Sequence, residues 1–141
     1  MNTLRPFHLA FPVTNLVDTR KWYTEILGCE VGRESEDWID FNLFGHQIVA
    51  HLVDNSVDNS SNIVDGKKIP SFHFGVILEW YEWQNFSEML IDKNIEFIVE
   101  PHIRFKGKPG EQATMFFEDP SGNNLEFKAF HSDNLIFAKS L

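Results

Sequence analysis

One carboxylate in the C-terminal part of the chain is placed where it requires a chemical partner. Glu126 lies in a stretch where Leu125, Phe127 and Ala129 alternate with polar residues, so a strand would put these three on one face and Glu126 on the other. An unpaired carboxylate among large apolar residues is costly to bury. Glu126 is therefore either a solvated residue of an edge strand or the partner of a basic side chain or a metal ion.

Two histidines occupy equivalent places in the two halves of the sequence. His8 lies in the stretch 7–11 and His73 in the stretch 72–76, each near the start of an expected strand. A pseudo-twofold axis between the halves would bring both together, with Glu126 arriving from an adjacent strand. Two imidazoles and one carboxylate leave open positions on a metal, which suits Fe(II) and is acceptable to Mn(II), Zn(II) or Ni(II). Taken singly, a histidine at the start of a strand is more often a packing residue than a ligand, so the metal site is indicated by the equivalent placement of the two together with Glu126.

The elements that must position these residues follow one order twice. A strand, a helix and three strands are expected first, and the same series then restarts. Two such halves, each a curved sheet covered by one helix, can place their concave faces around a shared cleft, so the fold class is α+β. The expected elements are 7–13, 16–27, 29–33, 38–44 and 47–53, then 71–78, 80–94, 95–99, 113–117 and 124–130.

A polar connection separates the two halves. Residues 54–68 are rich in Asp, Asn and Ser and show little periodicity, which is typical of an exposed loop. We expect one domain over 1–141. It would comprise a first module of about 5–54, a linker of about 55–69, a second module of about 70–131 and a tail over 132–141.

Composition excludes several classes of partner and favours the cytoplasm. The net charge of −9 argues against nucleic acid or an anionic membrane as the main partner. The single Cys29 excludes an intrachain disulfide and fits a reducing compartment. We find neither a signal-peptide pattern nor an apolar run long enough to span a bilayer. A small-molecule partner is the remaining expectation.

Several segments of the sequence form a recognisable set. They are 5–13, 38–42, 45–51, 104–107 through 112, and the turn 119–123 followed by Glu126. Together they resemble the vicinal oxygen chelate superfamily, which holds glyoxalase I, extradiol dioxygenases and bleomycin-resistance proteins. The similarity extends from Phe7 to Phe130 and is greatest to the small, single-domain proteins regarded as predicted extradiol dioxygenases. It implies two βαβββ modules, a divalent metal and often a homodimer.

The chain departs from the glyoxalase I pattern at the fourth metal ligand. Aligning Gly45 with Gly122 puts Val49 where that enzyme commonly has Glu, and valine cannot ligate. The resemblance therefore implies the three-ligand set His8, His73 and Glu126 of extradiol dioxygenases. His51, on the face of Val49, is predicted to act in acid–base catalysis. The alternatives are that His51 orients a metal ligand, that it is a fourth ligand if the strand register shifts, or that it has only a structural role.

Ring cleavage also requires a proton-transfer group and a substrate-binding surface. Both tyrosines lie on expected helices away from the cleft, which leaves His51, His46 and His102 as candidates. A basic loop with Arg104 and Lys106 is predicted to attract an anionic substrate, unless it is simply solvated. Gln47, near Val49 on the same face, is a third predicted substrate contact.

Three functions fit these residues. The favoured one is a metal-dependent dioxygenase that holds a divalent metal, with Fe(II) preferred, and binds its substrate through two vicinal oxygens. The second is a glyoxalase-like lyase or isomerase, which would use Ni, Zn or Mn and consume no oxygen. The third is a metal-free protein that sequesters an aromatic or antibiotic ligand in a cleft lined by Phe and Trp.

Overall fold

The computed structural model describes residues 3–54, 61–64 and 66–139 and divides the chain into two units. The first unit comprises Met1–Asn59 together with Asp119–Asn123, and the second comprises Ser60–Glu118 together with Asn124–Leu141. Each unit is a separate body with its own four-stranded sheet.

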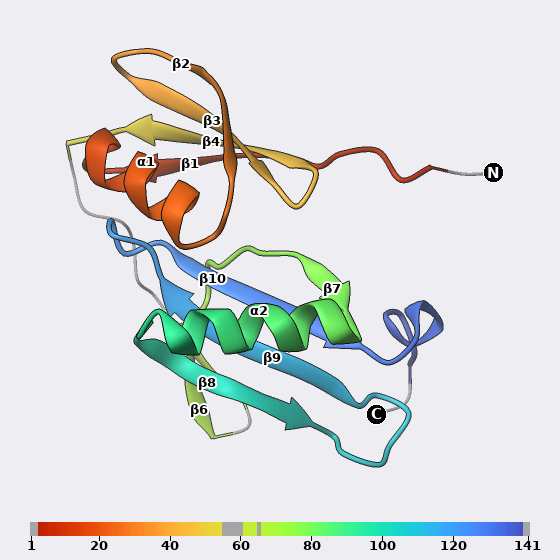
Figure 1. The fold of residues 1–141 in the computed structure, drawn as a ribbon. Helices are drawn as coiled ribbons and strands as arrows, with labels where there is room; N and C mark the ends of the chain where they lie inside the picture. The colour runs from red at the N-terminus through yellow and green to blue at the C-terminus, as the bar shows by residue number, and fades with distance from the viewer. Residues whose placement is uncertain (1–2, 55–60, 65, 140–141) are drawn as a thin grey trace. The chain divides into compact units, whose positions relative to one another are not determined.

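The first unit is a sheet covered on one face by a helix (Figure 1). Its strand order is β1-β4-β3-β2, with β1 parallel to β4 and the other neighbours antiparallel. Its elements are β1 (His8–Val13), α1 (Leu16–Glu25), β2 (Glu30–Glu34), β3 (Trp38–Leu43) and β4 (His46–Leu52).

A buried tyrosine joins the helix, the sheet and the turn 119–123 within the first unit. Helix α1 begins after Asn15, whose side-chain Oδ1 caps the helix by accepting from the backbone N–H of Asp18 at 2.9 Å. Tyr23 is fully buried, stacks on Phe41 with 5.0 Å between ring centroids, and donates a 2.8 Å hydrogen bond to Asp119 Oδ2. Burial raises the pKa of Tyr23 well above its ordinary value, so the phenol remains a donor.

The second unit repeats the same topology. Its sheet has the order β7-β10-β9-β8, with β7 parallel to β10, so the predicted duplication and the α+β class are confirmed. Its elements are β5 (Ser61–Val64), β6 (Lys67–Pro70), β7 (Ile77–Glu79), α2 (Trp80–Asp92), β8 (Phe97–Arg104), β9 (Gln112–Glu118), β10 (Asn124–Phe130) and a 3-10 turn at Asp133–Leu135.

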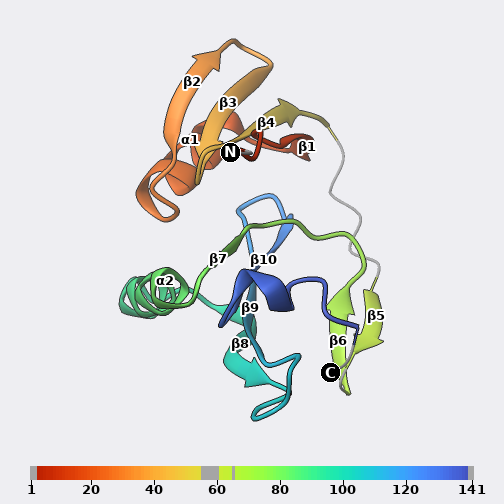
Figure 2. The same cartoon turned by 90° about the vertical axis from the view of Figure 1, so that its right-hand side faces the viewer.

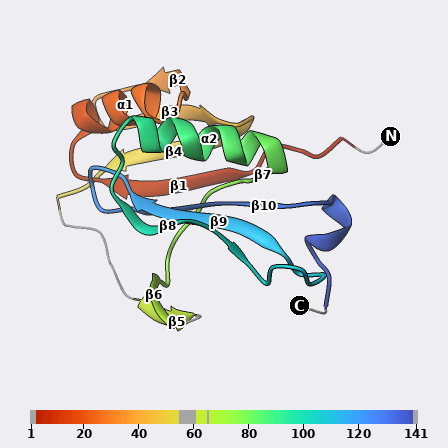
Figure 3. The ribbon, with the colours of Figure 1, turned by 60° about the horizontal axis from the view of Figure 1, so that its bottom comes forward.

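Helix α2 packs its apolar face on one side of this sheet (Figure 3). Trp83 Nε1 donates to the carbonyl of Phe127 at 2.7 Å, and the rings of Phe86 and Phe127 meet edge to face. Leu90 is fully buried, whereas Ile91 is 52% exposed. The β5–β6 hairpin lies on the opposite side of the sheet from α2 (Figure 2). Glu126 is on that other face as well, as its alternation with Leu125 and Phe127 predicts.

Three elements differ from the sequence prediction. Residues 61–70, partly assigned to a linker, contain the β5–β6 hairpin. Strand β8 continues through Pro101 to Arg104 instead of ending near Val99, because register shifts between Val99 and His102 accommodate a proline in the strand. The strand expected over 71–78 is reduced to β7 and a single bridge between Phe74 and Leu125.

Two further findings limit other roles. No helix in the described part of the chain is long and apolar enough to cross a membrane. Cys29 is buried, and burial raises the pKa of its thiol to about 12, so it is not a nucleophile at neutral pH.

Candidate functional site

A histidine and a carboxylate face each other in the second unit. His73 Nε2 lies 3.3 Å from Glu126 Oε1. The other ring nitrogen, Nδ1, is 2.7 Å from the carbonyl oxygen of Pro70, which can only accept, so Nδ1 carries a proton and donates it. The hydroxyl of Thr114 donates to Oε2 of Glu126. Each group is thus oriented by its own partner, and Nε2 and Oε1 are directed toward each other.

Two atoms that both carry lone pairs require a proton or a metal ion between them. Without a metal, a proton on Nε2 makes the pair an ion pair. The hydrogen bond with Glu126 raises the pKa of His73 above its ordinary value, although burial opposes this. Burial acts to raise the pKa of Glu126, but hydrogen bonds from His73 and Thr114 and the charge of Lys128 bring it below its ordinary value.

These shifts predict opposite pH dependences for metal-free stability and for metal binding. The contribution of His73 to stability is complete below its unfolded pKa of 6.5 and is lost as pH rises through the raised folded value. The contribution of Glu126 is present above 4.5 and is lost as pH falls through its lowered folded value. Metal must displace the proton from Nε2, so metal affinity should instead rise with pH.

Urea unfolding of metal-free wild type and Glu126→Gln at several pH values tests this. The stability difference between the two proteins should be greatest between pH 4.5 and 6.5 and should shrink by pH 9. A difference that grows steadily up to pH 9 would contradict the ion pair.

The pair opens into a pocket of about 190 Å³ on the sheet face away from α2. An apolar patch of Ile69, Val99 and Phe116 forms one part of its lining, and the ring of His73 meets Phe116 edge to face at 5.0 Å. The full lining is Val64, Lys67, Ile69, His73, Val99, His102, Arg104, Thr114, Phe116, Glu126 and Lys128.

The predicted residues of the first unit lie on β1 and β4. His8 is exposed at the start of β1, and its Nδ1 lies 2.8 Å from Oε1 of Gln47. His46 Nδ1 accepts from the backbone N–H of Phe7 at 2.8 Å, so it is occupied structurally. His51 is exposed near the end of β4. The meeting of His8 with the His73–Glu126 pair, and the catalytic role of His51, stay predictions.

Strand register supports the predicted equivalence of Val49 and Glu126. Leu9 pairs with Ile48 in the first unit as Phe74 pairs with Leu125 in the second. The residue after each of these partners is Val49 in one unit and Glu126 in the other. A valine, 7% exposed, thus occupies the place of the carboxylate.

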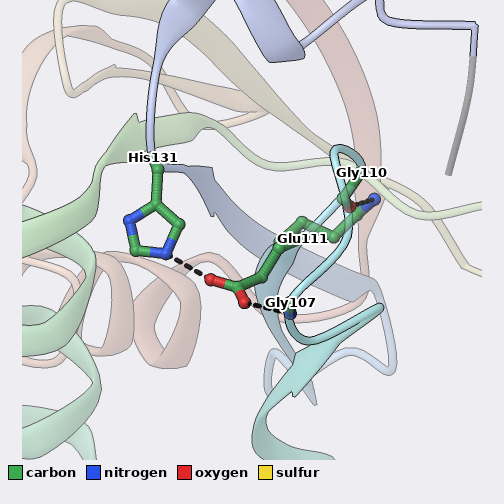
Figure 4. A network of polar contacts seen from close by, with 5 residues as sticks. Gly107, Gly110, Glu111 and His131 are labelled. Carbon is green, nitrogen blue, oxygen red and sulfur yellow. Dashed lines mark hydrogen bonds and ion pairs between the residues drawn. The ribbon is translucent and has the colours of Figure 1, made fainter.

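The predicted basic loop with Arg104 and Lys106 is in fact the end of strand β8 followed by a loop that hydrogen bonds hold in place. Arg104 is the last residue of β8 and lines the pocket, whereas Lys106 is exposed in the loop and is not a lining residue. Figure 4 shows how Glu111 fixes this loop: its Oε1 accepts from the backbone N–H of Gly107 at 2.7 Å, and its Oε2 pairs with His131. These two contacts lower the pKa of Glu111. His131 in turn stacks on Trp80, with 3.6 Å between ring centroids.

The donor set of the second unit fits a divalent metal, although the described residues hold no complete group of three His, Cys, Asp or Glu ligands. One imidazole nitrogen and one carboxylate oxygen converge, each held by a partner at its other polar atom, as is usual for metal ligands. A third protein ligand is required, and the described second unit does not supply it. His8, the third ligand that the resemblance implies, stays a prediction.

Sequence reasoning missed Thr114, Lys67 and the location of His102 in the pocket. Thr114 is opposite Lys128 in the β9–β10 register, two residues from the pair of Phe116 and Glu126. The side chains of Thr114 and Glu126 therefore lie on the same face of the sheet, which the sequence predicts once the β9–β10 hairpin is assigned. Lys67 had no usable signal, because its strand shows no alternation of polar and apolar residues.

Comparison with known proteins identifies the family. The sequence profile of the Glyoxalase/Bleomycin resistance protein/Dioxygenase superfamily matches residues 5–127. Among solved structures, a glyoxalase/bleomycin resistance protein/dioxygenase from Alicyclobacillus acidocaldarius is 32% identical, with a TM-score of 0.80 over 94% of this chain and 96% of that one. The chain belongs to this superfamily, and the predicted vicinal oxygen chelate membership is confirmed.

Two named relatives share the fold at lower identity. The fosfomycin resistance protein FosX from Listeria monocytogenes is 16% identical, with a TM-score of 0.69 over 96% of this chain and 98% of that one. Lactoylglutathione lyase from Agrobacterium tumefaciens is 14% identical, with a TM-score of 0.64 over 89% and 92%. No curated protein sequence matches the chain. The superfamily includes lyases and fosfomycin-modifying enzymes and commonly binds divalent metals.

Proposed function

We propose that this protein is a metal-dependent enzyme that cleaves the ring of a catechol-type compound with O2. The observation that supports it most is the pair His73–Glu126, whose Nε2 and Oε1 are 3.3 Å apart and open into a pocket. His8 would complete the ligand set, and Fe(II) is the preferred ion because two imidazoles and one carboxylate leave open positions for substrate and O2.

The protein side chains have separate tasks in this proposal. Pro70 and Thr114 hold the two ligands in place, and the bound metal would supply Lewis acidity and orient the substrate oxygens. His102 lines the same pocket, and its Nδ1 donates to the carbonyl of Glu100 at 2.9 Å. Nε2 of His102 is thereby left to accept and return a proton. His51 is the alternative acid–base residue.

The absence of a carboxylate at Val49 favours the three-ligand dioxygenase over the lyase. A glyoxalase-like lyase or isomerase remains the second candidate, since one solved neighbour is named lactoylglutathione lyase. A metal-free, resistance-type binding protein is the third. A homodimer in the cytoplasm is also part of the proposal, on the resemblance to the superfamily and the single cysteine.

Elemental analysis of anaerobically purified protein, wild type beside His73→Ala, separates these functions. About one equivalent of iron that is lost in the variant, followed by oxygen uptake with catechols, is the expected result. Bound nickel or zinc, together with no oxygen uptake, would overturn the dioxygenase assignment in favour of the lyase. Metal-free protein after growth in iron-supplemented medium would overturn the metal-dependent function.

A further inference from the structure

The pocket around His73 and Glu126 is positively charged in a protein that is strongly acidic. The chain has a formal net charge of −9. Among the described residues that line the pocket, Lys67, Arg104 and Lys128 are cationic, and Glu126 is the one carboxylate. Glu126 is engaged by His73 and Thr114 and also interacts with the charge of Lys128, but a single carboxylate leaves the three cations in excess. The pocket therefore has a charge opposite to that of the chain.

The three cations come from different elements and surround one space. Arg104 ends β8, and its guanidinium lies over the ring of Phe105. Lys128 is on β10, close enough to Glu126 and His73 to lower the pKa of both. Lys67 is on the β5–β6 hairpin, outside the four-stranded sheet. Cations placed on three separate strands are not explained by local sequence or by solvation of one basic segment.

The β5–β6 hairpin contributes both a cation, Lys67, and apolar side chains to the pocket lining. Val64 and Ile69 add apolar surface, and Ile69 is buried against Val99 and Phe116. A ligand that fits must offer an apolar part to this patch and negative charge to the cations. We infer that the substrate is a small organic oxyanion with an apolar part, such as a carboxylate or phosphonate, and that Lys67 on the β5–β6 hairpin is a specificity-determining residue for its anionic group.

This inference rests on the proposed function, because the anion would bind beside the metal ligands. It is tested without metal. Phenylphosphonate and uncharged benzyl alcohol are titrated calorimetrically into chelator-treated wild type, Lys67→Gln, Lys128→Gln and Lys68→Gln. Lys68 is the matched control, since it is exposed on the same strand and does not line the pocket.

We expect phenylphosphonate to bind more tightly than benzyl alcohol, with about tenfold weaker binding in Lys67→Gln and Lys128→Gln and none of this loss in Lys68→Gln. Affinity should also fall with added salt. Equal binding of the two probes, or an equal loss in Lys67→Gln and Lys68→Gln, would overturn the inference. The metal content of the untreated proteins is measured in parallel, so loss of the metal function is recognised separately from loss of anion selection.

Discussion

Glu126→Gln should purify with at least about 100-fold weaker metal affinity than the wild type, and so without a stoichiometric metal. The substitution keeps the shape of the side chain and removes the anionic oxygen that faces His73 Nε2 at 3.3 Å. An amide is a poor ligand for such an ion, and its NH2 group can take over the position of Oε1. Metal content by elemental analysis, with a chelator competition for affinity, measures the effect.

Glu118→Gln provides the matched control for this substitution. It changes the charge equally, but Glu118 is exposed at the end of β9 and does not line the pocket. We expect it to retain the wild-type metal content. A full equivalent of tightly bound metal in Glu126→Gln would remove Glu126 from the ligand set and with it the proposed site.

Gly75→Ala should unfold the second unit or destabilise it by more than about 4 kcal/mol. A Cβ at this position would lie 1.6 Å from the carbonyl oxygen of Glu126 and 2.6 Å from its carbonyl carbon. Both strands are fixed there, because Phe74 N donates to Asn124 O and Glu126 N donates to Phe74 O. The backbone must therefore separate, which also displaces His73 and the ligand pair.

Gly32→Ala is the control for this clash, since its Cβ would lie 3.2 Å from the Cβ of Asp40 and 3.8 Å from the carbonyl oxygen of Asp40. Its effect should remain within about 1 kcal/mol. Urea unfolding followed by far-ultraviolet circular dichroism compares the two variants with the wild type. Wild-type stability of Gly75→Ala would show that the 74–76 segment does not pair with β10 as described.

The repeated architecture was readable from the sequence because it depends on local patterns. Alternation placed Leu125 and Phe127 opposite Glu126. In the structure both are fully buried, Phe127 contacts helix α2, and Glu126 lines the pocket on the other face. The stretches 16–27 and 80–94, expected as helices, contain α1 and α2. Such features require only the period of the side chains and the chemistry of element ends.

The equivalence of the two halves was also visible in the sequence. It paired His73 with His8, whereas Glu126 was singled out by the alternation within its strand. The structure has His73 Nε2 at 3.3 Å from Glu126 Oε1, and the meeting of His8 with this pair stays a prediction. The same equivalence identified Val49 as the place of the missing carboxylate, which the strand register supports. Symmetry between halves conveys long-range information that a single element does not.

Only the tertiary structure decided what surrounds the pair. Arg104 was predicted as a substrate contact in a loop, but it lines the pocket from the end of a strand, because β8 continues past Pro101 through a register shift where local propensity ends the strand earlier. Lys67 lines the pocket from a polar hairpin whose sequence shows no periodicity. Position 75 must be glycine because the backbone of β10 leaves no space for a Cβ there. These positions depend on which strands pair and in which register, and the pairing energy comes from contacts distant in sequence.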